Sequence, residues 1–106
     1  MTISAATPND RKWIENQIEE VKQHFGNDIV KIRYDLDTDW VGDPAIHFRI
    51  LLPDTVADDD DRLGDVTGRV MDELVEKLGL PEADRYPYFN FRSQSEQAEL
   101  KEPEWD

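Results

Sequence analysis

Cationic side chains recur at alternate positions of three strand-like segments, and these residues are suited to binding an anion. The first segment carries Lys31 and Arg33, the second His47 and Arg49, and the third Arg92. The planar guanidinium group of arginine binds carboxylates and phosphates through two parallel hydrogen bonds. If the apolar residues that alternate with them face a layer of helices, all five cations share the other face of one sheet. The sequence therefore predicts a cationic sheet face with these five candidate binding residues.

Three explanations for such a face remain open. Carboxylates of the same chain could pair with the cations, since Asp35 lies on the same predicted face and residues 93–106 are acidic. Cross-strand pairs of opposite charge stabilise a sheet by only about 0.2–1 kcal/mol each. The face could instead dock a carboxylate- or phosphate-bearing partner. It could also form a homodimer, to which Leu51 and Tyr88 would add apolar contacts.

Trp40 is the sixth candidate binding residue. It stands in a polar connection between two strand-like segments, followed by Val41 and Gly42. A large indole ring left in water forgoes a sizeable hydrophobic gain, so the ring should find a partner. It either packs back on a helix or on the C-terminal segment, or it anchors an interface, where tryptophan is enriched. Trp105 raises the same question.

No catalytic or metal-binding motif accompanies these residues. The chain has no cysteine, which excludes disulfides, cysteine-ligated metals and thiol catalysis. The HExxH, GxSxG and P-loop patterns are absent as well. Asp35, Asp37 and Asp39 resemble the start of a calcium loop, but Trp40 and Ile46 stand where that loop needs Gly and an acid. We expect no catalytic residue, no metal and no cofactor.

Two amphipathic helices are expected to position the strands. The first, over 8–25, has apolar residues at steps of four, three and four: Ile14, Ile18, Val21 and Phe25. The second, over 61–78, has a similar stripe: Leu63, Val66, Val70, Leu74 and Leu78. Asp60 or Asp61 is the expected N-cap of the second helix, and Gly79 is its expected stop.

Three segments alternate apolar and polar residues with the period of a strand: 29–37, 45–52 and 86–92. The short polar connection after the first strand predicts an antiparallel hairpin. Residues 53–61 are expected to form a loop. The second helix then makes a crossover, which places the third strand parallel to the second or to a neighbour.

The order α-β-β-α-β predicts an α+β fold of two layers, with both helices on one face of a three-stranded mixed sheet. This corresponds to a ferredoxin-like chain without its first strand. We expect a single domain over 1–106, with a folded core of 8–92 and an acidic tail of 93–106. That tail is either a short helix around 96–101 or disordered.

The charge balance limits the partners. The 106 residues include 25 acidic and 12 basic ones, a net charge of −13, which argues against direct nucleic-acid binding because backbone affinity needs Lys and Arg. The longest apolar run, Ile50-Leu51-Leu52, is far shorter than the roughly 20 residues of a membrane span. Residues 1–6 lack the basic start and apolar stretch of a signal peptide. We expect a cytoplasmic protein that does not bind membranes.

Three sequence strings resemble those of a group of small uncharacterised bacterial acidic α/β proteins. They are DWVGDPAIHFR from Asp39, YPYFNFRSQSE from Tyr86 and KEPEW from Lys101. Proteins of this group look like those encoded beside HEPN-domain or nucleotidyltransferase-type genes, in pairs similar to toxin–antitoxin systems. The resemblance implies a protein partner, toxin-like in character, and assigns no role to any residue.

These observations favour a non-enzymatic interaction domain, antitoxin-like or regulatory, whose acidic surface steers a basic protein partner. One alternative is an inhibitor that mimics nucleic acid, with carboxylates in place of phosphates. Another is a small-anion binder or enzyme that uses the Arg/His face, which would need a concave pocket with convergent donors. Adaptation to a saline habitat would also account for the acidity.

Overall fold

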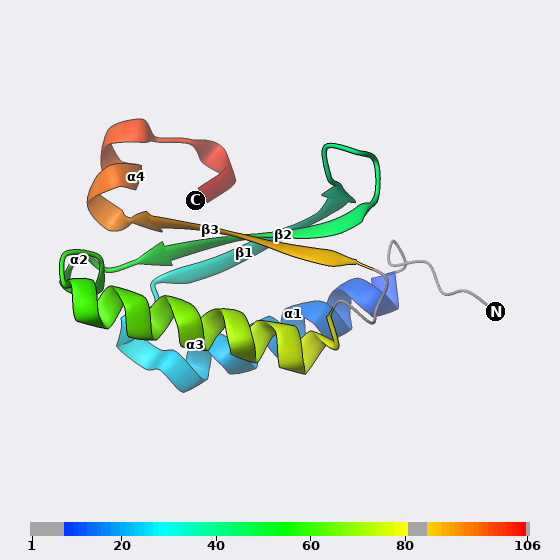
Figure 1. The fold of residues 1–106 in the computed structure, drawn as a ribbon, viewed down its shortest axis with the longest axis horizontal. Coiled ribbons are helices and arrows are strands. Elements are labelled where there is room, and N and C mark those ends of the chain that lie inside the picture. Colours follow the sequence, from blue (N-terminus) through cyan, green and yellow to red (C-terminus); the bar gives the residue numbers. More distant parts are fainter. Residues whose placement is uncertain (1–7, 81–84, 106) are drawn as a thin grey trace.

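The computed structural model describes residues 8–80 and 85–105, with side chains from residue 11 onward. Two long helices lie on one side of a three-stranded sheet, and the C-terminal segment lies on the other side (Figure 1). The order of the main elements is α-β-β-α-β, as the sequence predicts. The α+β architecture with both long helices on one face of a mixed sheet is therefore confirmed.

The long helices are α1, Pro8–Phe25, and α3, Asp60–Leu78. A short 3-10 turn, η1, spans Gly26–Asp28 after α1. Helix α3 ends at Gly79, whose φ of 65° is the left-handed conformation that glycine adopts most easily. The expected N-cap, Asp60 or Asp61, was wrong. Asp59 is the extended residue whose carboxylate accepts hydrogen bonds from the backbone N–H groups of Asp61 and Arg62, whereas Asp60 and Asp61 already belong to the first turn.

The sheet contains β1, Lys31–Thr38, β2, Pro44–Leu52, and β3, Tyr86–Ser93, in that spatial order. Strands β1 and β2 form the predicted antiparallel hairpin, and β3 pairs parallel to β2. The crossover through α3 thus brings β3 directly beside the strand it follows. The sequence left open whether β3 pairs with β2 or with a neighbouring strand, and the structure shows that it pairs with β2 itself.

The predicted loop over 53–61 contains a further helix, α2, Asp54–Ala57. Its Val56 is fully buried in the core. The backbone N–H groups of Val56 and Ala57 both donate to the carbonyl of Pro53 and so close the turn. One turn of helix is too short to show a helical period, so the sequence alone did not reveal it. The prediction of a continuous loop was wrong for this reason.

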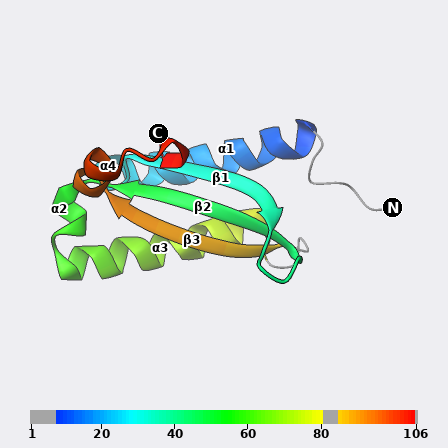
Figure 2. The ribbon, with the colours of Figure 1, turned by 90° about the horizontal axis from the view of Figure 1, so that it is seen from above.

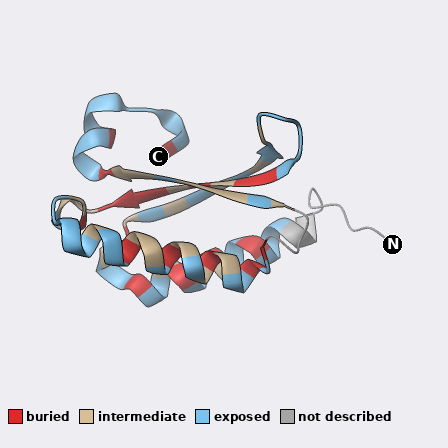
Figure 3. Ribbon diagram, in the orientation of Figure 1, coloured by how far each residue is buried: buried red, intermediate tan, exposed pale blue. Residues whose placement is uncertain are grey.

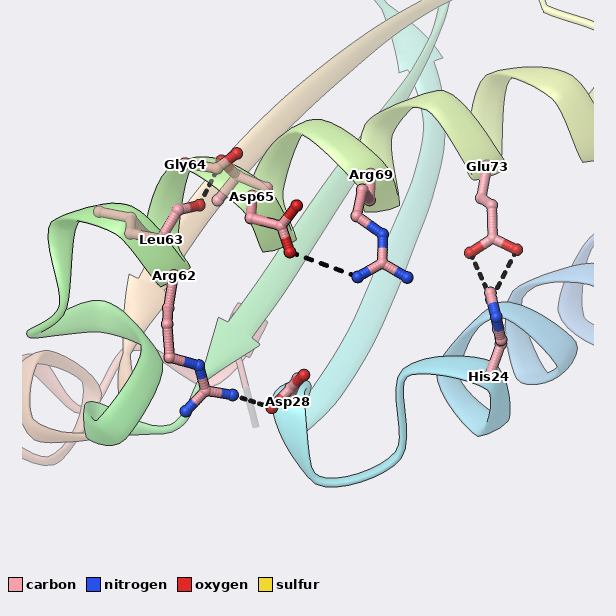
Figure 4. A network of polar contacts seen from close by, with 9 residues as sticks. His24, Asp28, Arg62, Leu63, Gly64, Asp65, Arg69 and Glu73 are labelled. Atoms are coloured by element: carbon pink, nitrogen blue, oxygen red, sulfur yellow. Dashed lines mark hydrogen bonds and ion pairs between the residues drawn. The ribbon is translucent and has the colours of Figure 1, made fainter.

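The core lies between the helices and the sheet, and the buried stripes of α1 and α3 face it (Figure 3). The central strand β2 contributes four deeply buried residues to this core: Ile46, Phe48, Ile50 and Leu52. Polar contacts tie the helix layer together (Figure 4). His24 Nδ1 lies 2.9 Å from both carboxylate oxygens of Glu73, and Arg62 of α3 pairs with Asp28 of η1.

The segment after β3 is ordered as helix α4, Gln94–Leu100, followed by the 3-10 turn η2, Pro103–Trp105. A capping box begins α4, because Ser93 and Glu96 exchange side-chain and backbone hydrogen bonds. Asp54 of α2 also accepts hydrogen bonds from the backbone N–H and the hydroxyl of Ser95. Of the two states that the sequence left open for this segment, the structure shows the helix.

No helix among the described residues is long and apolar enough to cross a membrane.

Candidate functional site

The sheet face away from α1 and α3, here called the open face, carries the candidate cations. The strand register arranges its residues in four rows across β1, β2 and β3. Listed from one end to the other, the rows are Lys31–Leu51–Arg92, Arg33–Arg49–Asn90, Asp35–His47–Tyr88 and Asp37–Ala45–Tyr86. The prediction that the five cations share one face is confirmed. The rows add a polarity along that face, with cations at one end and aspartates and tyrosines at the other.

Arg92, at the cationic end, is enclosed by the C-terminal strap, which we define as residues 101–105. Its guanidinium carbon lies 4.4 Å from the ring centroid of Trp105, a cation–π distance, and its Nη2 lies 2.7 Å from Glu102 Oε1. Its Nη1 also donates to Gln97 Oε1 at 2.9 Å. Gln97 in turn donates to the carbonyl of Glu102 at 2.8 Å. The guanidinium of Arg92 is therefore satisfied by groups of its own chain.

The strap also shields Leu51, the apolar residue between Lys31 and Arg92. The η2 turn packs against β2, and Leu51 is only 9% exposed although it points away from the core. Leu51 is thus buried within one chain, where the sequence had offered it as a contact of a homodimer. In Figure 1 the strap lies over one end of the open face and leaves the other end uncovered.

Two further candidate cations also contact the chain itself. Arg49 is half-buried and forms an ion pair with Asp35, its diagonal neighbour on β1. The ring of His47 stacks on Tyr88 at 5.2 Å between centroids, and its Nε2 lies 3.2 Å from the carbonyl oxygen of Thr38. Lys31 and Arg33 occupy exposed positions on the edge strand β1. The structure brings all five cations onto one face, and it engages three of them in the contacts described above.

Trp40 lies at the opposite end, in the hairpin tip, which we define as residues 39–43. Asp39 Oδ1 accepts hydrogen bonds from the backbone N–H of Val41 at 3.0 Å and of Asp43 at 2.9 Å. The backbone of Asp39 also accepts from Gly42 and donates to Asp43. Asp39 therefore fixes the shape of the whole tip.

The tip is also fastened to the third strand. The hydroxyl group of Tyr88 donates to Asp39 Oδ2 at 3.2 Å. Desolvation alone would raise the pKa of Asp39, but hydrogen bonds from Asp43, Val41 and Tyr88 outweigh it and lower that pKa below its ordinary value. Desolvation and the same contact with Asp39 raise the pKa of Tyr88. The Asp39 carboxylate thus holds the tip in place in its charged form.

Despite this fixed backbone, the indole of Trp40 is 90% exposed. It packs neither on a helix nor on the C-terminal segment, so the first of the two fates that the sequence allowed was wrong. The neighbouring Val41 is exposed as well. Tyr86, at the start of β3, adds a third exposed apolar side chain at this end of the open face.

Sequence reasoning missed several residues that build these two ends. The sequence indicates Asp39 only as part of an incomplete calcium-loop pattern, and it does not indicate Gln97. Arg85 was missed as well; it donates to the carbonyl of Ala45 at 2.8 Å, next to the tip. The Asp-x-x-Gly pattern of residues 39–42 is a turn signal that could have indicated Asp39. No pattern in the sequence indicates the contacts of Gln97 or Arg85.

The described residues contain no group of three or more His, Asp or Glu side chains arranged to hold a metal ion. Comparison with family models gave no match to this chain. Comparisons with curated proteins and with solved structures gave none either. The function must therefore be argued from the two ends of the open face themselves.

Proposed function

We propose that this chain is a non-enzymatic protein-interaction domain that binds a basic protein partner through its hairpin tip. The observation that carries the proposal is Trp40, an indole 90% exposed on a turn whose backbone is held by Asp39 and Tyr88. Tryptophan dominates the energetics of many interfaces. A preformed turn also lowers the entropy cost of ordering a loop on binding.

The charge around Trp40 supports a basic partner. Between Arg33 and Arg49 the chain carries four aspartates and no Lys or Arg. Two of these, Asp35 and Asp37, lie on the open face beside the tip, and Asp39 and Asp43 lie in the tip itself. An exposed tryptophan with carboxylates near it is complementary to an apolar pocket bordered by Lys and Arg on the partner.

The contacts of the cations favour this function over small-anion binding. Arg92 and Arg49 are ion-paired with Glu102 and Asp35, and His47 is stacked on Tyr88. A ligand anion at either arginine would have to displace a carboxylate of the chain. A toxin-like protein with a basic surface has the partner chemistry proposed here, and the chain would then act as its antitoxin-like or regulatory partner.

The proposal is tested by affinity purification from the native host with quantitative mass spectrometry. The bait is the full chain, compared with Trp40→Ala and with Trp13→Ala as the matched control. Trp13 is also a partly exposed tryptophan, 49% exposed, but it belongs to α1 in the other layer. We expect a basic protein that is retained by the wild type and by Trp13→Ala and is lost with Trp40→Ala.

Equal retention on all three baits would rule out the tip as the docking site. Retention that is insensitive to Trp40 but falls steeply with salt would instead support the nucleic-acid-mimic alternative, because polyanion binding weakens strongly with ionic strength. Arg49→Ala serves as a second probe. Loss of the partner with that variant alone would favour the cationic part of the face.

A further inference from the structure

We propose that the C-terminal strap is a displaceable cover over a second docking surface, which binds an acidic, tryptophan-bearing segment of a protein partner. This surface lies at the cationic end of the open face, around Arg92 and Leu51, and it does not involve the hairpin tip. The strap occupies it within the same chain and shows which chemistry it accepts. This inference is independent of the proposed function of Trp40.

The strap makes two kinds of contact with one side chain. The guanidinium carbon of Arg92 lies over the indole of Trp105, 4.4 Å from its centroid, while Nη2 of the same side chain lies 2.7 Å from Glu102 Oε1. Glu102 and Trp105 are three residues apart, so one tight turn supplies both groups. Arginine suits this combination because it stacks on aromatic rings and binds carboxylates with its fork.

The surface under the strap is complementary to such a segment. Leu51 provides an apolar centre, with Lys31 on one side and Arg92 on the other. Arg33 and Arg49 occupy the next row. Without the strap, this end of the face would expose an apolar patch bordered by cations. Its charge would be positive, whereas that of the hairpin tip is negative. It therefore fits a partner segment in which acids flank a large aromatic residue.

Most residues of the strap and of the preceding helix α4 are exposed, which favours displacement of the strap. Within 94–105, the buried residues are Gln97 and Trp105, and most of the segment is exposed (Figure 3). Its hinge, Lys101, has a φ of 51°, a left-handed conformation that a residue with a side chain adopts at a cost. Release of the strap would relieve this strain. Figure 2 shows that α4 and the strap lie together at the end of the sheet where β3 ends.

A partner segment must compete with a cover tethered to the same chain. A short tether gives the strap an effective concentration in the millimolar range, so a free peptide with the same contacts binds the closed chain poorly. A partner that makes an additional contact, for example with Lys31 at the exposed edge of the patch, can displace it. The strap thereby favours partners that make more contacts with this surface than the strap itself does.

The test uses a fluorescein-labelled synthetic peptide of residues 101–106, with the sequence KEPEWD, and the full-length chain. Binding is measured by fluorescence anisotropy. The double variant Glu102→Ala/Trp105→Ala removes the contacts of the strap in the chain itself, and Glu104→Ala, an exposed acid of the same strap, is the matched control. We expect the peptide to bind the double variant at least about tenfold more tightly than the wild type or the control, because the tethered competitor is gone.

Three additional measurements define the site. A peptide in which Ala replaces the tryptophan should not bind, and Arg92→Ala in the double variant should abolish binding. Trp40→Ala in the double variant should leave it unchanged, which separates this surface from the hairpin tip. Equal binding to wild type and double variant, or binding that does not depend on Arg92, would overturn the proposal.

Circular dichroism checks that the double variant is folded. If it is not, Glu102→Ala alone replaces it, because this change removes one partly exposed ion-pair partner and leaves Trp105 in place. We then expect about threefold tighter peptide binding than to the wild type, reflecting a weakened cover. No gain in binding to this folded variant would also overturn the proposal.

Discussion

The hairpin tip and the C-terminal strap have similar compositions and opposite fates. Each places a tryptophan among acidic residues: Asp39 and Asp43 around Trp40, Glu102 and Glu104 around Trp105. Yet the indole of Trp40 is 90% exposed and that of Trp105 is 7% exposed. Both segments rise on the same side of the sheet, at its two ends (Figure 1).

The difference comes from what the sheet presents beneath each segment. The strap folds over Leu51 and Arg92, which supply an apolar contact and a cation for its acids. The tip extends beyond the last row of the open face, and its carboxylate Asp39 is used to hold its own turn. An acidic tryptophan segment is therefore buried where cations meet it and stays exposed where its acids are already engaged.

The largest expected effect separates the two tryptophans by stability. Trp105→Ala should lower the free energy of unfolding by about 2 kcal/mol, less than the roughly 3–5 kcal/mol of a core Trp, because only the strap depends on it. Trp40→Ala should change it by no more than about 0.5 kcal/mol, as is usual for an exposed side chain. Urea denaturation followed by circular dichroism measures both, and equal losses would break the comparison.

A smaller effect is expected from the contacts that fix the tip. Asp39→Ala removes the acceptor for Val41, Asp43 and Tyr88, and it should lower the free energy of unfolding by less than Trp105→Ala does. Tyr88→Phe removes only one of these hydrogen bonds, so it should lower the free energy of unfolding by less than Asp39→Ala does. The same urea experiment applies. If Asp39→Ala proves neutral, the tip is not preorganised and the entropy argument for Trp40 fails.

The smallest effect is a dependence on pH, expected at the hairpin tip and at the start of α4, the helix that leads to the strap. Asp54 of α2 lies beside the start of α4, where hydrogen bonds from the side chain and backbone of Ser95 lower its pKa. In the tip, hydrogen bonds likewise lower the pKa of Asp39. A carboxyl group whose pKa is lowered by folding stabilises the protein above its unfolded-state pKa. That stabilisation is lost as the pH falls through the folded-state pKa.

We therefore expect Asp39→Asn and Asp54→Asn to be less stable than wild type near neutral pH, with the difference shrinking below about pH 4. Unfolding free energies measured between about pH 6 and pH 2 test this window. Ser95→Ala is the control for Asp54, since it removes the hydrogen bond from the hydroxyl and should weaken the pH dependence of that site alone. A difference that does not vary with pH would contradict the assignment.

Much of the fold was accessible from the sequence because it rests on short-range periodicity. The apolar steps from Ile14 to Phe25 and from Leu63 to Leu78 predicted α1 and α3 close to their observed ends. The helix α2 was missed because a single turn has no period. The N-cap was misassigned because four consecutive aspartates offer the same side chain, and only the backbone conformation of Asp59 selects one of them.

The candidate site was predicted in part for the same physical reason. A period of two determines which residues share a sheet face, so the sequence by itself placed Lys31, Arg33, His47, Arg49 and Arg92 together. Whether a given cation is paired within the chain depends on contacts between distant segments, such as that of Arg92 with Glu102. Only the tertiary structure decided these contacts. Trp105 is buried because the strap folds over the cationic end of the sheet, and Trp40 is exposed because the tip extends beyond the other end.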